Sequence, residues 1–174
     1  MRILIAYATT EGQTRKICRH CADRLIDRGH SVELLPVDED GGLDLQRFDA
    51  AILAGSVHME RVQPALVAFA KTHSQALARI RTLYLQVSLA AAGNDYEEWS
   101  GLRRIARRLA AETGWAPGRT EHVAGAFRFT EYDFFKSWAM RWIAAQHDRK
   151  VDPHKDTEFT DWEALDRVLD DWAA

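Results

Sequence analysis

Cysteine is scarce in this chain, which has only Cys18 and Cys21 among its 174 residues. Two cysteines three positions apart cannot supply the disulfide framework of a small secreted domain, so we expect a protein of a reducing compartment, the cytoplasm. The Cys-x-x-Cys spacing also occurs in redox motifs, but here it falls inside a helical pattern, away from the helix start that activates a thiolate. Two ligands do not make a zinc site, and we predict two small buried side chains and no metal.

Long apolar runs are also lacking. No run approaches the roughly 20 residues that a membrane-spanning helix needs, and the apolar residues 3–8 are too few for a signal peptide. The net charge of -3 excludes the overall basicity that is typical of nucleic-acid-binding proteins, so no nucleic-acid partner is expected. We expect one soluble domain over residues 1–174, with at most a peripheral contact to the inner face of the cytoplasmic membrane.

What the sequence does contain is a regular alternation of short apolar runs and amphipathic segments. The runs are typical of strands buried on both faces, and the segments have the three- and four-residue spacing of helices. The predicted strands are 3–8, 32–37, 50–56, 83–87 and 120–126, and the predicted helices are 14–28, 64–80, 102–109 and a last one that begins at a capping box, Thr160 to Glu163. Parallel strands need right-handed helical crossovers, so the pattern predicts an α/β fold, a three-layer, doubly wound sheet of five parallel strands.

The turn after the first predicted strand is suited to an anion. Residues 9–14 read Thr-Thr-Glu-Gly-Gln-Thr at the start of a helix, where unpaired backbone N–H groups and the helix dipole favour negative charge. The hydroxyls of Thr9, Thr10 and Thr14 can donate further hydrogen bonds. The turn has neither the Gly-Lys-Ser/Thr of an NTPase loop nor a GxGxxG motif, so a mononucleotide phosphate fits better. The alternative is a threonine-rich turn in which Thr14 or a neighbour only caps the helix.

The turns after the third and fourth predicted strands should face the same site, because ligands of such sheets bind at the carboxyl ends of the strands, where the strand order reverses. Tyr96 and Trp99 could cover a flat ring by offset stacking, or could simply pack the next helix. His58 could relay a proton, since the ordinary pKa of histidine lies near physiological pH, or could be a solvated loop residue. The candidates in these turns are Ser56, Val57, His58, Ser88, Leu89, Ala90, Ala91, Gly93 and Tyr96.

Residues 9–15 resemble the Ser/Thr-x-x-Gly-x-Thr phosphate loop of flavodoxins, and the order and spacing of the predicted strands agree with that fold. A closer resemblance, over nearly the whole chain, is to the flavodoxin-like, menaquinone-dependent protoporphyrinogen oxidases of bacterial heme synthesis. It is carried by residues 11–15, 124–129 and 159–163. The turn after the third strand lacks that family's aromatic residues, so the residue that stacks on the flavin ring stays open.

The resemblance implies an FMN flavoprotein that oxidises protoporphyrinogen IX to protoporphyrin IX and passes the electrons to a quinone. A flavin performs the redox step itself, and the protein supplies a flat slot of backbone amides and apolar walls. The residues expected to bind FMN are Thr9, Thr10, Glu11, Gly12, Gln13, Thr14, Ser56, Val57, His58, Ser88, Leu89, Ala90, Ala91, Gly93 and Tyr96.

The stretch 128–159, between the fifth predicted strand and the last helix, is too long for a simple loop, and we predict a helical insertion there. Its central part places Phe135, Trp138 and Trp142 on one helical face with basic residues nearby. Such a helix suits a membrane interface with anionic lipids, or a cap over the edge of the flavin. The alternative is an aromatic helix packed on the sheet.

Positive charge is concentrated in the second half of the chain. Residues 100–155 hold eleven Lys and Arg against six Asp and Glu, which favours an anionic partner. Arg128, at the end of the fifth predicted strand, could bind a propionate of a tetrapyrrole substrate. The alternative is a solvated basic face.

Three classes of function compete. The leading hypothesis is the quinone-linked flavoenzyme, and the alternative is a flavodoxin-type electron carrier without a small substrate of its own. A carrier usually meets its partners through a strongly acidic rim, against which the basic middle of this chain argues. A phosphoacceptor receiver domain would need an acidic pair after the first strand and an Asp after the third, where this chain has residues 7–9, Tyr-Ala-Thr, and 55–56, Gly-Ser.

Overall fold

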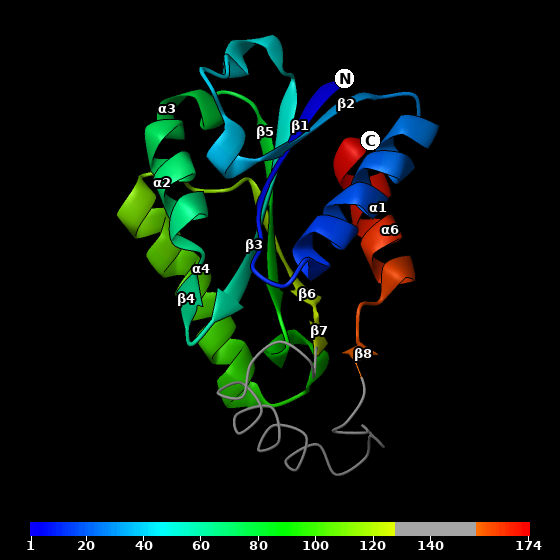
Figure 1. Ribbon diagram of the computed structural model, residues 1–174, viewed down its shortest axis with the longest axis vertical. Helices are drawn as coiled ribbons and strands as arrows, with labels where there is room; N and C mark the ends of the chain where they lie inside the picture. The colour runs from blue at the N-terminus through cyan, green and yellow to red at the C-terminus, as the bar shows by residue number, and fades with distance from the viewer. Residues whose placement is uncertain (128–155) are drawn as a thin grey trace.

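Five parallel strands form the centre of the protein, in the order β2-β1-β3-β5-β6 (Figure 1). The structure, a computed structural model, describes residues 1–127 and 156–174. The strands are β1 (Arg2–Ala8), β2 (Ser31–Pro36), β3 (Ala50–His58), β5 (Arg81–Ser88) and β6 (Arg119–Ala124). Every neighbouring pair is parallel, so the predicted five-stranded, doubly wound α/β sheet is confirmed.

Helices cover both faces of this sheet (Figure 1). One face carries α1 (Gln13–Asp27) and α6 (Trp162–Ala173), and the other carries α2 (Pro64–Thr72), α3 (Ser74–Leu77) and α4 (Tyr96–Thr113). Short 3-10 turns lie at residues 37–39, 45–47 and 90–92. The result is the three-layer arrangement that the sequence predicts.

The side chains of β1 explain why the strands are apolar throughout. Successive side chains of a strand point to opposite faces, so a strand covered on both faces has no polar side. The side chains in the core with α1 and α6 are Ile3, Ile5 and Tyr7, and those in the core with α2 and α4 are Leu4, Ala6 and Ala8.

The two cysteines of α1 are buried, as predicted. Cys18 and Cys21 lie in the core between α1 and the sheet, and neither forms a disulfide. Burial raises the pKa of Cys21 to about 12 and raises that of Cys18 as well. Both side chains are therefore neutral packing groups near neutral pH.

The strand β3 runs two residues further than predicted and ends at His58. It then turns through Met59 and Glu60, whose φ values are 49° and 59°, into the short antiparallel strand β4 (Arg61–Val62). The expectation of a turn at Val57 and His58 is wrong, because pairing with β4 keeps both residues in the strand. Ser56, the last residue of the predicted strand, is also in β3, where it pairs with Val87 of β5.

The helix α2 packs very close to β3 at Gly55. A Cβ atom built on Gly55 would lie 2.5 Å from Cδ2 of Leu66, so a larger residue there would push the helix side chain away.

The single helix predicted over 64–80 is divided into α2 and α3, because the backbone leaves helical geometry at His73 (φ -100°, ψ 10°).

The last two helices differ from prediction at their starts. α4 begins well before residue 102, since Asp95 caps it by accepting a hydrogen bond from the Glu98 amide. The start of α6 is capped by Asp161, which accepts from the Ala164 amide, and not by Thr160. The capping box was wrong because the Thr160 hydroxyl donates to the Ala124 carbonyl at 2.7 Å, which ties it to the end of β6.

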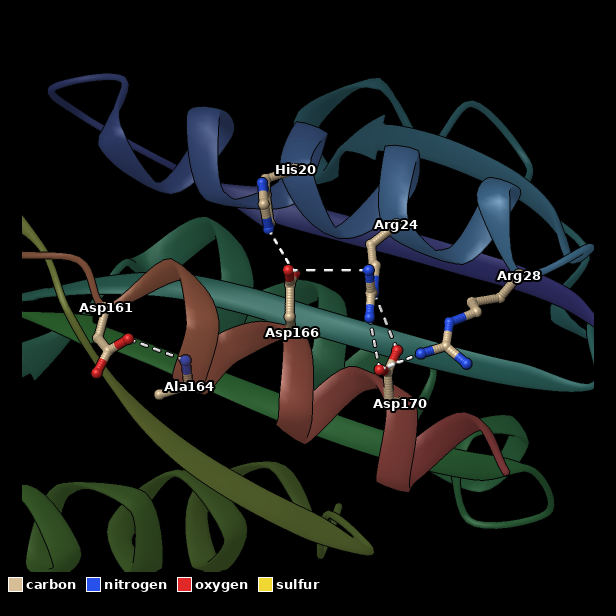
Figure 2. A network of polar contacts seen from close by, with 7 residues as sticks. All are labelled: His20, Arg24, Arg28, Asp161, Ala164, Asp166 and Asp170. Atoms are coloured by element: carbon tan, nitrogen blue, oxygen red, sulfur yellow. Dashed lines mark hydrogen bonds and ion pairs between the residues drawn. The ribbon is translucent and has the colours of Figure 1, made fainter.

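Figure 2 shows how α6 is fixed against α1. His20 lies 2.7 Å from Asp166, and the guanidinium of Arg24 donates two hydrogen bonds to Asp170, at 3.0 and 2.6 Å. Arg28 also contacts Asp170. The hydrogen bond from Arg24 is the main reason why the pKa of Asp170 lies below its ordinary value. These pairs join the middle and the end of α1 to the middle and the end of α6.

Two short antiparallel strands, β7 (Ala126–Phe127) and β8 (Thr157–Glu158), flank the stretch 128–155. The predicted helical insertion, with Arg128, Phe135, Trp138 and Trp142, lies outside the described residues.

In the part of the chain that the structure describes, no helix is both long enough and apolar enough to cross a membrane. Within the same residues, no group of three or more His, Cys, Asp or Glu is placed to hold a metal ion.

Candidate functional site

The candidate site lies at the carboxyl ends of β1, β3 and β5. The strand order reverses between β1 and β3, since β2 lies on one side of β1 and β3 on the other. Ala8, the last residue of β1, lies opposite Gly55 of β3. The loop after β1 and the end of β3 are therefore neighbours, as expected.

The loop after β1 is shaped by Gly12. This residue precedes α1 with φ 83°, a conformation that glycine adopts without strain. Its amide donates to the Thr9 hydroxyl at 3.0 Å, and its carbonyl accepts from the Lys16 amide at 3.0 Å. No side chain caps α1, so the alternative that Thr14 or a neighbour caps the helix is wrong.

Among the residues of the loop after β1 and the start of α1, Thr14 gives the clearest indication of a ligand site. Its side chain is 1% exposed, and its hydroxyl has no hydrogen-bond partner within residues 1–127 and 156–174. A buried polar group without a partner is costly and calls for an explanation. The first amides of α1, at 13–15, also have no carbonyl partner inside the helix, and the first turn contains no acidic residue. The arrangement suits a bound anion.

The Gln13 side chain, predicted to bind the cofactor, points instead toward the end of the chain. Its Nε2 donates to Glu158 and to the Thr160 hydroxyl, both at 3.0 Å. Glu158 also accepts from Lys16 at 2.6 Å and from the Trp162 indole at 3.0 Å. Partial burial acts to raise the pKa of Glu158, but these hydrogen bonds outweigh it and keep the pKa below its ordinary value.

Hydrogen bonds of the Ser88 and Trp99 side chains stabilise the loop after β5. The Ser88 hydroxyl accepts from the Ala91 amide at 3.3 Å. The Trp99 indole donates to the Gly93 carbonyl at 2.8 Å, and its ring meets the edge of His122 at 5.6 Å between centroids. Trp99 therefore follows the packing alternative. Tyr96, at the start of α4, is 78% exposed.

His58 and Met59 lie where β3 ends and the chain turns into β4. His58 is half-buried at the end of β3, and burial lowers its pKa below the ordinary value, so the neutral ring is the main form at neutral pH. The neutral ring can accept a proton. Met59, at the tip of the turn into β4, is 73% exposed.

Two polar residues of the site, Gln63 and Glu158, were not predicted. Gln63 donates through Nε2 to the hydroxyls of Thr10 and Ser56, and so links the loop after β1 to the end of β3. Pro64 directly after Gln63 indicated a helix start, but no local pattern indicated where the Gln63 side chain would point. Glu158 reaches the site from the far end of the chain.

The fold and the site define a flavoprotein class: the chain belongs to the flavodoxin domain family, whose profile matches residues 4–154. The protoporphyrinogen IX dehydrogenase (quinone) of Escherichia coli strain K12 is 24% identical over 165 residues, covering 95% of this chain and 91% of the relative. The protein of the same name from Leishmania major is 24% identical, covering 99% and 75% of the two chains. The chain is thus a distant homologue of these dehydrogenases over its full length.

A solved short-chain flavodoxin associated with a bacterial microcompartment has the same fold. It superposes with a TM-score of 0.60 at 10% identity, covering 99% of this chain and 97% of that one. The flavodoxin fold implies FMN binding, and the residues present fit that group. The unpartnered, buried Thr14 hydroxyl and the free amides at the start of α1 are the donors that an FMN phosphate needs.

Proposed function

We propose that the protein binds FMN at the carboxyl edge of its sheet and oxidises protoporphyrinogen IX to protoporphyrin IX, with a quinone as electron acceptor. The observation that carries this proposal is homology over 95% of the chain to a protoporphyrinogen IX dehydrogenase (quinone). The buried donors around Thr14 support the cofactor part independently of that relationship. When bound, FMN supplies the redox chemistry, and the protein binds, orients and shields.

Different residues of the site have different roles in this proposal. The Thr10 and Thr14 hydroxyls and the first amides of α1 hold the phosphate. We assign the faces of the ring to two exposed residues, Tyr96 at the start of α4 and Met59 in the turn between β3 and β4. His58, neutral at neutral pH, is the candidate to accept a proton released during oxidation of the substrate.

The test is an anaerobic assay of the purified, FMN-loaded protein with protoporphyrinogen and a menaquinone analogue. The enzyme should produce fluorescent porphyrin in a quinone-dependent manner, and faster than free FMN at the same concentration. The Thr14→Val variant, which lacks the buried donor, should bind FMN about tenfold more weakly and should need more added FMN to reach full activity. Porphyrin formation no faster than with free FMN would contradict the enzymatic proposal.

A flavodoxin-type electron carrier is the second candidate, because flavodoxins share this fold over nearly the whole chain. The exposed face of α4 argues against an acidic docking rim there, since it presents four arginines: Arg103, Arg104, Arg107 and Arg108. A carrier would retain FMN and exchange electrons with a reductase, but would not oxidise protoporphyrinogen. The same anaerobic assay therefore separates the two candidates.

The proposal also includes Arg128 as a partner for a substrate propionate, and Phe135, Trp138 and Trp142 as a peripheral membrane contact. Arg128→Ala should raise the KM for protoporphyrinogen and leave FMN binding unchanged. Trp138→Ala combined with Trp142→Ala should reduce sedimentation with anionic liposomes. Unchanged sedimentation would remove the membrane contact from the proposal.

A further inference from the structure

Hydrogen bonds hold the backbone of Gln63 in place at both its amide and its carbonyl group. Its amide donates to the Ser56 carbonyl at 3.3 Å, and its carbonyl accepts from the amides of Leu66 and Val67 at 3.0 and 3.2 Å. Pro64 follows as the first residue of α2 and restricts the chain further. The Gln63 side chain therefore starts from a point that is set by the sheet and by the helix together.

That side chain links the proposed phosphate loop after β1 to the end of β3. Its Nε2 atom donates to the Thr10 hydroxyl in the loop after β1. The same atom donates to the Ser56 hydroxyl at the end of β3, at a distance of 2.9 Å. Ser56 is 8% exposed, whereas Thr10 is exposed. One amide group thus connects a buried anchor to an exposed residue of the phosphate loop.

The direction of these hydrogen bonds determines what Thr10 can do. A hydroxyl group has one hydrogen to donate and two lone pairs with which to accept. Because Gln63 donates to Thr10, the Thr10 oxygen uses a lone pair there and keeps its hydrogen for another acceptor. An exposed hydroxyl whose lone pair is occupied in this way is prepared to donate to an anion.

We propose that Gln63 is a positioning residue for the cofactor phosphate: it holds Thr10 in place and reserves the Thr10 hydrogen for the phosphate, without contacting the phosphate itself. This inference rests on the proposed FMN site and goes beyond it, since it assigns a residue outside the phosphate loop to recognition of the phosphate. Preorganised donors bind more tightly because less ordering is needed on binding.

Riboflavin, which is FMN without its phosphate, provides the experiment. The dissociation constants of FMN and of riboflavin are measured by quenching of flavin fluorescence for the wild type and for Gln63→Leu and Gln63→Glu. Gln63→Leu should raise the Kd of FMN about tenfold, the effect of one weakened hydrogen bond to a charged group, and should change that of riboflavin by less than about twofold. Gln63→Glu should weaken FMN further, because a carboxylate takes the Thr10 hydrogen and repels the phosphate.

Gln75 provides matched controls. It is exposed on α3, away from the carboxyl ends of the strands, so Gln75→Leu and Gln75→Glu repeat the same chemical changes outside the site. Both should bind FMN and riboflavin like the wild type. Thermal unfolding of each FMN-free variant checks folding, and Gln63→Glu keeps a polar side chain of similar size in case Gln63→Leu is unstable.

A double-mutant cycle with Thr10→Val tests whether Gln63 acts through Thr10. Thr10→Val alone should weaken FMN about tenfold, and adding Gln63→Leu should then change the Kd by no more than about twofold. The inference is overturned if the fold-changes in the Kd of FMN caused by the two substitutions multiply in the double variant. It is also overturned if the Gln63 variants bind FMN like the wild type, or if their Kd values for FMN and for riboflavin rise by the same factor. A wild type that retains no FMN would refute the proposed cofactor itself, which is a separate outcome.

Discussion

The ammonium group of Lys16 lies 2.6 Å from Oε2 of Glu158, although the two residues are 142 positions apart in the sequence. Lys16 belongs to the first turn of α1, directly after the proposed phosphate loop, and Glu158 ends β8. Gln13 of the same helix donates to the same carboxylate. The chain that returns after residue 155 is therefore attached to the helix that starts the candidate FMN site.

Glu158 should matter more to stability than Lys16. Lys16→Met should lower the free energy of unfolding by at most about 1 kcal/mol, because the lysine side chain is 58% exposed. Glu158→Leu should cost about 1–3 kcal/mol, since it leaves the donors of Gln13 and Trp162 without their acceptor. Urea unfolding near neutral pH measures both. A larger loss for Lys16→Met than for Glu158→Leu would contradict the central role of the carboxylate.

Thr14→Val should stabilise the FMN-free protein while it weakens FMN binding. Valine has nearly the same shape and removes the buried hydroxyl, so the free energy of unfolding should rise by about 1 kcal/mol, whereas the Kd of FMN should rise about tenfold. The control is Thr113→Val, whose buried hydroxyl donates to the Leu109 carbonyl at 2.8 Å. That variant should lose stability and keep its FMN affinity. If Thr14→Val destabilised the FMN-free protein, its hydroxyl would have a structural partner.

Gly12→Ala should affect both stability and cofactor binding. Nothing lies within 4 Å of a Cβ at Gly12, so the cost is the left-handed backbone alone, about 1–2 kcal/mol. Gly114, at the end of α4 with φ 71°, has the same open surroundings. Gly114→Ala should lose a similar amount of stability in thermal unfolding, but only Gly12→Ala should also weaken FMN. Equal FMN affinities for the two variants would argue against the phosphate loop.

His122 should make the protein sensitive to mild acid. Burial, and to a smaller extent the charge of Arg103, lower its pKa below the ordinary value of 6.5, although Glu121 acts in the opposite direction. The unfolded chain therefore binds a proton that the folded chain does not, so stability falls as the pH drops below about 6.5 and through the lowered pKa. His122→Phe keeps a ring against Trp99 and removes the titration. Its Tm should fall less than that of the wild type between about pH 7.5 and about pH 5.5, and equal losses would exclude His122 as the cause.

The five parallel strands were predictable because burial on both faces leaves an apolar run that local sequence shows directly. The turn from β3 into β4 was not, since its two residues with positive φ are Met59 and Glu60, and neither type favours that conformation. The loop after β1 was predictable as a candidate anion site, because a helix start provides free amides whatever the rest of the fold. The roles of Gln63 and Glu158 were not, because each depends on contacts with distant parts of the chain.

The pairing of β7 with β8 has a consequence for insertions and deletions between the two strands. It places Phe127 beside Thr157, so the described residues on the two sides of the stretch 128–155 are neighbours. Closing a loop whose ends already meet depends only weakly on its length. We therefore expect a change in the length of the stretch 128–155 to have only a weak effect on the free energy of unfolding of the domain.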